Sequence, residues 1–164
     1  DLPLPFAPAA VEFRDDQTMA AGSRVDYGVR RTRIKSLPPT PENLWIFQRL
    51  GNLVAKVNQA AYHFQLDGQM SVDVLGYDPD GYFDWHVDIG PGIFATRKLS
   101  MVTFLTPPDT YQGGNLCFMD QGEPLRPAQG TTAIFPAYLL HKVEPVTAGT
   151  RYTLVSWAHG PSFT

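Results

Sequence analysis

The sequence predicts a mainly β fold, a two-sheet β-sandwich or jelly roll that is backed by a helix. Two observations carry this prediction. From Met70 onward, short β-prone runs alternate with clusters of Pro, Gly and Asp at regular spacing. Upstream of them, one segment has the periodicity of an amphipathic helix.

The helix is expected over residues 41–60. Thr40-Pro41-Glu42 is a typical helix start, with a capping hydroxyl, a proline in the first turn and an early acid. Apolar residues then recur at steps of three and four, which places one stripe against a core; they are Leu44, Phe47, Leu50, Val54, Val57 and Ala61. Trp45 and Phe47 are interpreted as core anchors.

The strands are expected within a core of residues 70–158. Seven runs are predicted: Ser71–Tyr77, Tyr82–Ile89, Lys98–Leu105, Asn115–Met119, Thr131–Phe135, Leu139–Val143 and Arg151–Trp157. A further strand over Val29–Leu37 falls in an N-terminal extension, residues 1–40. Its cations are interpreted as a solvated face of that strand; they are Arg30, Arg31, Arg33 and Lys35. The whole chain, 1–164, is expected to be a single domain.

Composition narrows the function classes. With Lys+Arg 13 against Asp+Glu 16, the chain lacks the basic excess that neutralises phosphates, so no nucleic-acid partner is expected. No apolar run approaches the roughly 20 residues that span a bilayer, so no membrane partner is expected and we predict a cytoplasmic protein. The only cysteine, Cys117, is interpreted as a core residue. No expectation about the oligomeric state follows from the sequence.

His86 and Asp88 are the first candidate metal ligands. Residues i and i+2 of a strand point to the same side, so these two side chains project together while Val87 faces away. His141, after the run that begins at Tyr138, is the candidate third ligand. Two imidazoles and one carboxylate on separate segments are typical of a non-haem Fe(II) site with open coordination positions.

Arg151 follows His141 by ten residues, and the turn-rich segment between them suggests adjoining strands. Arg151, Thr153, Val155 and Trp157 should then share a face. An inward arginine needs a negative partner, and its fork matches a carboxylate, to which the Thr153 hydroxyl could add a second hydrogen bond. The structural alternative is an ion pair between Arg151 and Glu144 or Asp120. His63 and His159 are interpreted as structural or solvated.

These residues fall within a longer set of motifs. The set comprises Tyr77-x-x-x-Gly81-x-Phe83-x-x-His86-x-Asp88, Arg97-Lys-Leu-Ser100, Tyr111-x-Gly113-Gly114-x-Leu116, Gly130, Phe135-Pro136 and His141-x-Val-x-Pro145-Val-Thr-x-Gly149-x-Arg151. From about residue 40 to its end the chain resembles the 2-oxoglutarate/Fe(II)-dependent dioxygenases of the prolyl 4-hydroxylase type, and among them the bacterial hydroxylases.

The resemblance implies a double-stranded β-helix, the jelly roll of this family, with Fe(II) held by His86, Asp88 and His141. It implies that Arg151 pairs with the distal carboxylate of 2-oxoglutarate and that Tyr77 donates to this cosubstrate. Arg97 and Trp157 match positions that face the substrate or lie near the metal, and we expect them to contact substrate.

The reaction that the resemblance implies is hydroxylation of an unactivated C–H bond. O2 is consumed, 2-oxoglutarate is converted to succinate and CO2, and ascorbate is expected to stimulate turnover. The expected substrate is a prolyl residue or another amino acid, a peptide or a small molecule.

Two other functions use similar residues. A non-catalytic jelly roll that holds a metal and binds a ligand would share the fold and the histidines, but it would not need Arg151 and Thr153 to face the metal. A Zn(II) hydrolase would also use histidine and carboxylate ligands.

Overall fold

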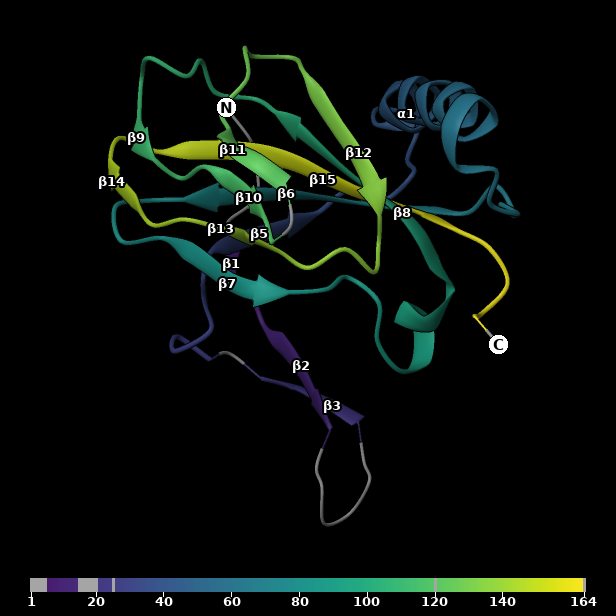
Figure 1. Cartoon of the computed structure of the whole chain (residues 1–164), viewed down its shortest axis with the longest axis horizontal. Coiled ribbons are helices and arrows are strands. Elements are labelled where there is room, and N and C mark those ends of the chain that lie inside the picture. Colours follow the sequence, from purple (N-terminus) through teal and green to yellow (C-terminus); the bar gives the residue numbers. More distant parts are fainter. Residues whose placement is uncertain (1–5, 15–20, 25, 120, 164) are drawn as a thin grey trace.

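Two antiparallel β-sheets face each other in the computed structural model, which describes residues 6–14, 21–24, 26–119 and 121–163 (Figure 1). Side chains from both sheets form the main core between them; among them are Tyr77, Phe104, Leu116, Val143 and Trp157. This sandwich is the predicted jelly roll, and its core residues come from the alternate positions that point inward from each strand.

The major sheet has six strands in the order β1-β5-β6-β15-β8-β12. They span Ala7–Pro8, Arg33–Ser36, Met70–Tyr77, Arg151–His159, Arg97–Phe104 and Thr132–Pro136. The minor sheet has five strands in the order β11-β10-β13-β7-β4. They span Gln121–Leu125, Leu116–Phe118, His141–Val143, Tyr82–His86 and Arg30–Arg31.

Two strand pairs lie outside these sheets. β9 (Gln112–Gly113) pairs with β14 (Val146–Ala148). β2 (Val11–Arg14) pairs with β3 (Ala21–Arg24), and this hairpin projects away from the sandwich (Figure 1).

The helix α1 (Leu44–Val57) packs on the outer face of the major sheet and continues as a π-helical turn, η1 (Asn58–Tyr62). Leu50 packs with outward residues of β6 and β15, and Val54 packs with outward residues of β8 and β15. The supporting helix is therefore confirmed. β15 lies between the helix and the minor sheet. Its outward side chains contact the helix, and its inward side chains point into the space between the two sheets, where they can form a site.

The helix differs from the prediction at its start. Residues 41–43 form a turn, closed by the Asn43 N–H donating to the Thr40 carbonyl (2.9 Å), and the helix begins at Leu44. Trp45 is not a core anchor, because 61% of it is exposed. It precedes Val54 by nine residues, which is two and a half turns, so it falls on the opposite face.

The strand predictions hold in the core, but several details differ. The strand predicted over Val29–Leu37 is two short strands, β4 and β5, which belong to different sheets, and β11 was not predicted. The strand predicted to end at Ile89 ends at His86, so Asp88 lies just beyond it. The segment between His141 and Arg151, expected to be a turn, contains β14. This segment crosses between sheets, so His141 and Arg151 lie on facing sheets rather than on adjoining strands. Among the described residues, no helix is both long and apolar enough to cross a membrane.

Candidate metal centre and adjoining cavity

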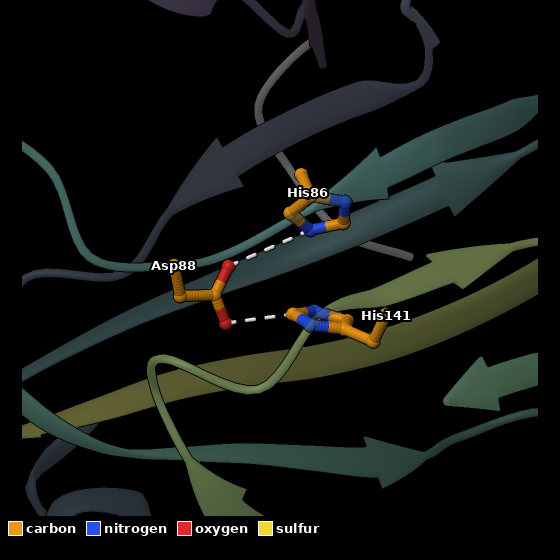
Figure 2. Close-up of side chains that lie close together, drawn as sticks. All are labelled: His86, Asp88 and His141. Carbon is orange, nitrogen blue, oxygen red and sulfur yellow. Dashed lines mark ion pairs between the residues drawn. The ribbon is translucent and has the colours of Figure 1, made fainter. Parts of the chain in front are cut away.

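Three side chains, two on the minor sheet and one just beyond the end of β7, converge on one point (Figure 2). His86 ends β7, Asp88 follows it by two residues, and His141 begins β13 opposite His86. The Asp88 carboxylate lies between the rings, with Oδ1 3.5 Å from His86 Nε2 and Oδ2 3.7 Å from His141 Nε2. One ligand atom from each residue lies within 4.8 Å of the others, so the three could hold one metal ion.

Backbone carbonyls orient both imidazoles. Nδ1 of His86 donates to the Asp84 carbonyl (2.7 Å), and Nδ1 of His141 donates to the Leu139 carbonyl (2.8 Å). Because a carbonyl can only accept, Nδ1 carries the proton in each ring. The Nε2 lone pairs therefore point toward the shared centre, which is the tautomer that a metal ligand needs.

Asp88 is held by groups on two other segments, β8 and the residue after β12. Ser100 on β8 donates to Oδ2 (2.6 Å), the Asp88 N–H donates to the Ala137 carbonyl (2.8 Å), and Arg97 donates to the Asp88 carbonyl (3.1 Å). The Ser100 contact was not predicted, although Ser100 lies in the Arg97-Lys-Leu-Ser100 motif. Only the packing of β8 against the strand end at Asp88 brings the hydroxyl to the carboxylate.

Protonation favours metal binding at this site. Burial raises the pKa of Asp88, but its interactions with His86 and His141 and the hydrogen bond from the Ser100 hydroxyl outweigh it and hold the pKa below its usual range. Burial lowers the pKa of His141, against the attraction of Asp88. An ionised carboxylate and a neutral imidazole are the forms that coordinate metal, so both shifts favour metal binding.

A β-bulge shapes β7 beside the metal ligands. His86 pairs with His141 and Phe83 with Val143, so three steps along β7 match two steps along β13. The extra residue turns Phe83 and His86 to the same face, where their rings stack with centroids 3.5 Å apart. Phe83 thus becomes a wall of the site.

The triad opens into a cavity of about 1130 Å³ between the two sheets. Its lining includes every residue predicted for the site: His86, Asp88, His141, Tyr77, Arg97, Arg151, Thr153 and Trp157. The inward face of β15 contributes Arg151, Thr153, Val155 and Trp157, as predicted from alternation. The facing sheets therefore bring the metal ligands and the arginine to one space.

Arg151 is the most deeply buried charge in this cavity, with 1% of the residue exposed. None of its guanidinium nitrogens has a hydrogen-bond partner among the described residues, and the Thr153 hydroxyl has none there either. The guanidinium carbon lies 5.1 Å from the Tyr77 ring centroid and 5.2 Å from that of Phe104. Burial lowers the pKa of Arg151, and the Tyr77 and Tyr111 hydroxyls act in the opposite direction.

The ion-pair alternative for Arg151 is not seen in the described residues. Glu144 accepts instead from Asn115 (2.8 Å), and Asp120 lies outside the described residues. Arg151 and Thr153 thus form a buried donor set suited to an anion that enters the cavity.

Arg97 and Trp157 contact each other in the lining of the same cavity. The Arg97 guanidinium is 3.7 Å from the Trp157 ring centroid and 4.3 Å from that of Phe94. Phe94 belongs to η2 (Gly92–Thr96), a short 3-10 helix in the loop that follows Asp88. This loop borders the cavity through Gly90, Pro91 and Ala95, so it forms part of the rim.

The other two histidines and the cysteine do not line the cavity. His63 is exposed and caps η1 in a left-handed conformation. His159 hydrogen-bonds with Thr96 (2.9 Å) and Ser71 (3.2 Å). Cys117 is buried and free.

Arg30 differs from its prediction. It was expected on the solvated face of a strand, but it lines the cavity.

Comparison with known proteins identifies the family of this chain. Residues 72–159, more than half of the chain, match the model of the 2OG-Fe(II) oxygenase superfamily. A PKHD-type hydroxylase of Delftia acidovorans is 28% identical over 83% of this chain and 66% of its own length. Another, of Methylobacterium nodulans, is 34% identical over 82% of this chain and 65% of its own length. The chain thus spans about two thirds of these relatives.

A crystal structure of a prolyl-4-hydroxylase from Pseudomonas putida has a similar fold. The TM-score is 0.69 at 21% identity, and the match covers 83% of this chain and 76% of that one. At this identity the likeness concerns the fold alone. It supports the predicted double-stranded β-helix.

Proposed function

Since the chain belongs to the 2OG-Fe(II) oxygenase superfamily, we propose that it is a 2-oxoglutarate- and Fe(II)-dependent hydroxylase that acts on an unactivated C–H bond. The products would be the hydroxylated substrate, succinate and CO2. The observation that carries the proposal is the pairing of two separate sites in one cavity, a His-Asp-His triad and the unpartnered Arg151.

His86, Asp88 and His141 are the proposed Fe(II) ligands. The donor set fits this ion. Two imidazoles with free Nε2 lone pairs and one ionised carboxylate would occupy one face of the metal's coordination sphere and leave the positions toward the cavity open. Ser100 and the two carbonyl acceptors would hold these ligands in place. When bound, iron would supply the redox chemistry that activates O2.

Arg151, Thr153 and Tyr77 are the proposed 2-oxoglutarate contacts. A dicarboxylate would place one carboxylate on the Arg151 fork and the Thr153 hydroxyl, which supplies the partner that these buried donors need. A non-catalytic metal-binding jelly roll would have no use for a buried, inward arginine at this position. The same feature argues against a Zn(II) hydrolase.

Arg97 and Trp157 are the proposed substrate contacts. Arg97 is fixed between two rings and bonded to the Asp88 backbone, so it couples the substrate side of the cavity to a metal ligand. The names of the relatives, PKHD-type hydroxylase and prolyl-4-hydroxylase, support an amino-acid or peptide substrate.

The decisive experiment measures cosubstrate binding and turnover with the purified chain. Calorimetry with Mn(II) should show that 2-oxoglutarate binds in the presence of metal. With Fe(II), O2 and ascorbate, succinate should form slowly without substrate and faster with an accepted one. Neither binding nor succinate formation from metal-replete protein would refute the proposal, and unchanged turnover without O2 would favour a hydrolase.

A further inference from the structure

Two charged side chains in the cavity have no role in the proposed reaction. After the triad, Arg151 and Arg97 are assigned, Arg30 on β4 and Asp73 on β6 remain among the ionisable residues of the lining. They come from different sheets, so they face the same space from opposite sides.

Arg30 is partly buried, and no matching anion is paired with it among the described residues. Its Nε has no hydrogen-bond partner in the described part of the chain, and Nη1 makes one long contact of 3.4 Å with the Ala10 carbonyl. The guanidinium carbon lies 4.4 Å from the centroid of the Phe83 ring, which itself stacks on the metal ligand His86. A buried guanidinium nitrogen without an acceptor is costly, and an anion bound at this position would remove that cost.

Asp73 supplies the opposite charge. Its neighbours at alternate positions of β6, Leu75 and Tyr77, line the cavity with it, so the carboxylate shares their inward face. It accepts one hydrogen bond, from the Ser36 hydroxyl (2.6 Å). The charges of Asp73 and Asp88 both act on Arg30, although neither forms an ion pair with it within the described residues.

We propose that the substrate is a free α-amino acid, held as a zwitterion with its carboxylate on Arg30 and its ammonium group on Asp73. This inference rests on the proposed hydroxylase function and narrows its substrate class. A residue inside a peptide has neither charged group, so it would leave both side chains unmatched. Arg97 is the weaker candidate for the carboxylate, because it already donates to the Asp88 carbonyl and lies between two rings.

The test uses the Zn(II)-loaded chain with 2-oxoglutarate, which binds substrate without turning it over. Saturation-transfer NMR is recorded with a pool of the common L-amino acids. The matched pool carries acetylated amino groups and amidated carboxyl groups. We expect signals from one or more free amino acids and none from their blocked counterparts.

Substitutions test whether Arg30 binds the carboxylate and Asp73 binds the ammonium group. Arg30→Gln and Asp73→Asn should each weaken binding of the responding amino acid about 10- to 100-fold, the usual effect of losing a charge-assisted hydrogen bond. Arg30→Lys keeps the charge but loses the fork, so its affinity should be intermediate. Arg31→Gln is the matched control, because Arg31 is exposed and lies over the Tyr27 ring, outside this cavity.

Calorimetry of 2-oxoglutarate in every variant separates the possible failures. Unchanged 2-oxoglutarate affinity shows that a variant is folded and that the cosubstrate site is intact. Binding of the blocked pool, binding of neither pool, or full affinity in Arg30→Gln would overturn the zwitterion proposal while the hydroxylase stands. Loss of 2-oxoglutarate binding in the unmodified chain would instead refute the hydroxylase itself.

Discussion

Arg151 shows most clearly how one residue links burial to function. Its guanidinium is almost fully buried, and its contacts are the faces of two aromatic rings rather than an acid. Leaving such a charge without an anion costs several kcal/mol. The chain keeps this cation buried at the start of its central strand, where an incoming carboxylate would compensate the cost.

Arg151→Gln should therefore weaken 2-oxoglutarate binding by about 10- to 100-fold, because a charge-assisted bidentate contact is lost. Metal affinity should stay the same, since no hydrogen bond or ion pair joins Arg151 to the triad among the described residues. Calorimetry with Mn(II) and 2-oxoglutarate measures both. Arg49→Gln, on the exposed side of the helix, is the control, and equal 2-oxoglutarate affinity in the two variants would contradict the assignment.

Ser100→Ala tests the support of the carboxylate ligand. Without the 2.6 Å hydrogen bond to Oδ2, Asp88 loses its fixed orientation, and metal affinity should fall about 10- to 100-fold. The affinity for Mn(II), measured by its electron paramagnetic resonance signal, checks this. Ser162→Ala, in the exposed C-terminal segment, should leave the affinity unchanged.

The side chains that point into the site could be predicted where the alternation of a strand alone decides their direction. His86 with Asp88, and Arg151 with Thr153, could be paired from their spacing. Ser100 and Arg30 could not be placed in this way. Their contacts depend on how β8 and β4 pack against β7 and the segment after it, and this packing is tertiary information that a single strand pattern does not contain.

At the scale of elements, the loop before β10 determines how closely the chain approaches Arg151. Gly114 has φ +65°, and a Cβ there would lie 2.9 Å from Cδ of Arg151 and 2.8 Å from Cγ2 of Val146. A glycine is required both for the left-handed backbone and for the space.

Gly114→Ala should lower both stability and 2-oxoglutarate affinity, because the Arg151 stem must move. Gly130→Ala is a matched control: φ is +85°, but nothing lies within 4 Å of its Cβ, so it bears only the backbone strain of roughly 1–2 kcal/mol. Thermal melting and calorimetry compare the two. If Gly130→Ala loses as much 2-oxoglutarate affinity as Gly114→Ala, the steric explanation is wrong.

The loop that carries η2 is tied to the end of β15 by His159. The Thr96 hydroxyl donates to the Ile93 carbonyl (2.9 Å), so it must accept from Nδ1 of His159. Burial and the charge of Arg97 lower the pKa of His159. The neutral ring therefore stabilises the fold fully above the unfolded pKa of about 6.5, and this contribution is lost as pH falls through the lower folded value.

His159→Asn should remove this pH dependence while keeping a donor near Thr96. Between pH 7.5 and 5.5, Tm of the unmodified chain should fall further than Tm of the variant. His141 is present in both proteins, so its titration cancels in the comparison. Parallel melting curves at every pH would exclude His159 as the source.

Element existence was more predictable than element detail. Long β-prone runs and the helical stripe could be recognised, because their periodicity extends over many residues. The short β9 and β14 could not, because Gly113 and the polar residues beside them look like turns until they pair. The β7 bulge was also missed, since its extra residue is defined only by the register of β13.

At the scale of the whole molecule, the proposed metal ligands lie on the minor sheet and the proposed cosubstrate contacts lie on the major sheet. A 2-oxoglutarate molecule bound to both would connect the sheets. Ligands that bind only the folded state stabilise it by mass action.

Mn(II) with 2-oxoglutarate at about 100 times its Kd should stabilise the fold by about 2.7 kcal/mol, a rise in Tm of roughly 5–10 °C. EDTA should remove the effect. Differential scanning fluorimetry measures it, with Arg151→Gln as the variant that keeps the metal-dependent rise and loses the increment from 2-oxoglutarate. An equal increment in that variant would show that the two sheets are not connected through Arg151.

The central position of β15 also fixes a length. Arg151 and Trp157 are six positions apart on one inward face, which is about 20 Å along an extended strand. The strand backbone therefore sets the distance between the proposed 2-oxoglutarate contact at Arg151 and the proposed substrate contact at Trp157. Deleting two residues between them would preserve the alternation of inward and outward side chains and would shorten this distance by about 7 Å. The length of β15 thus sets the length of the cavity between these two contacts.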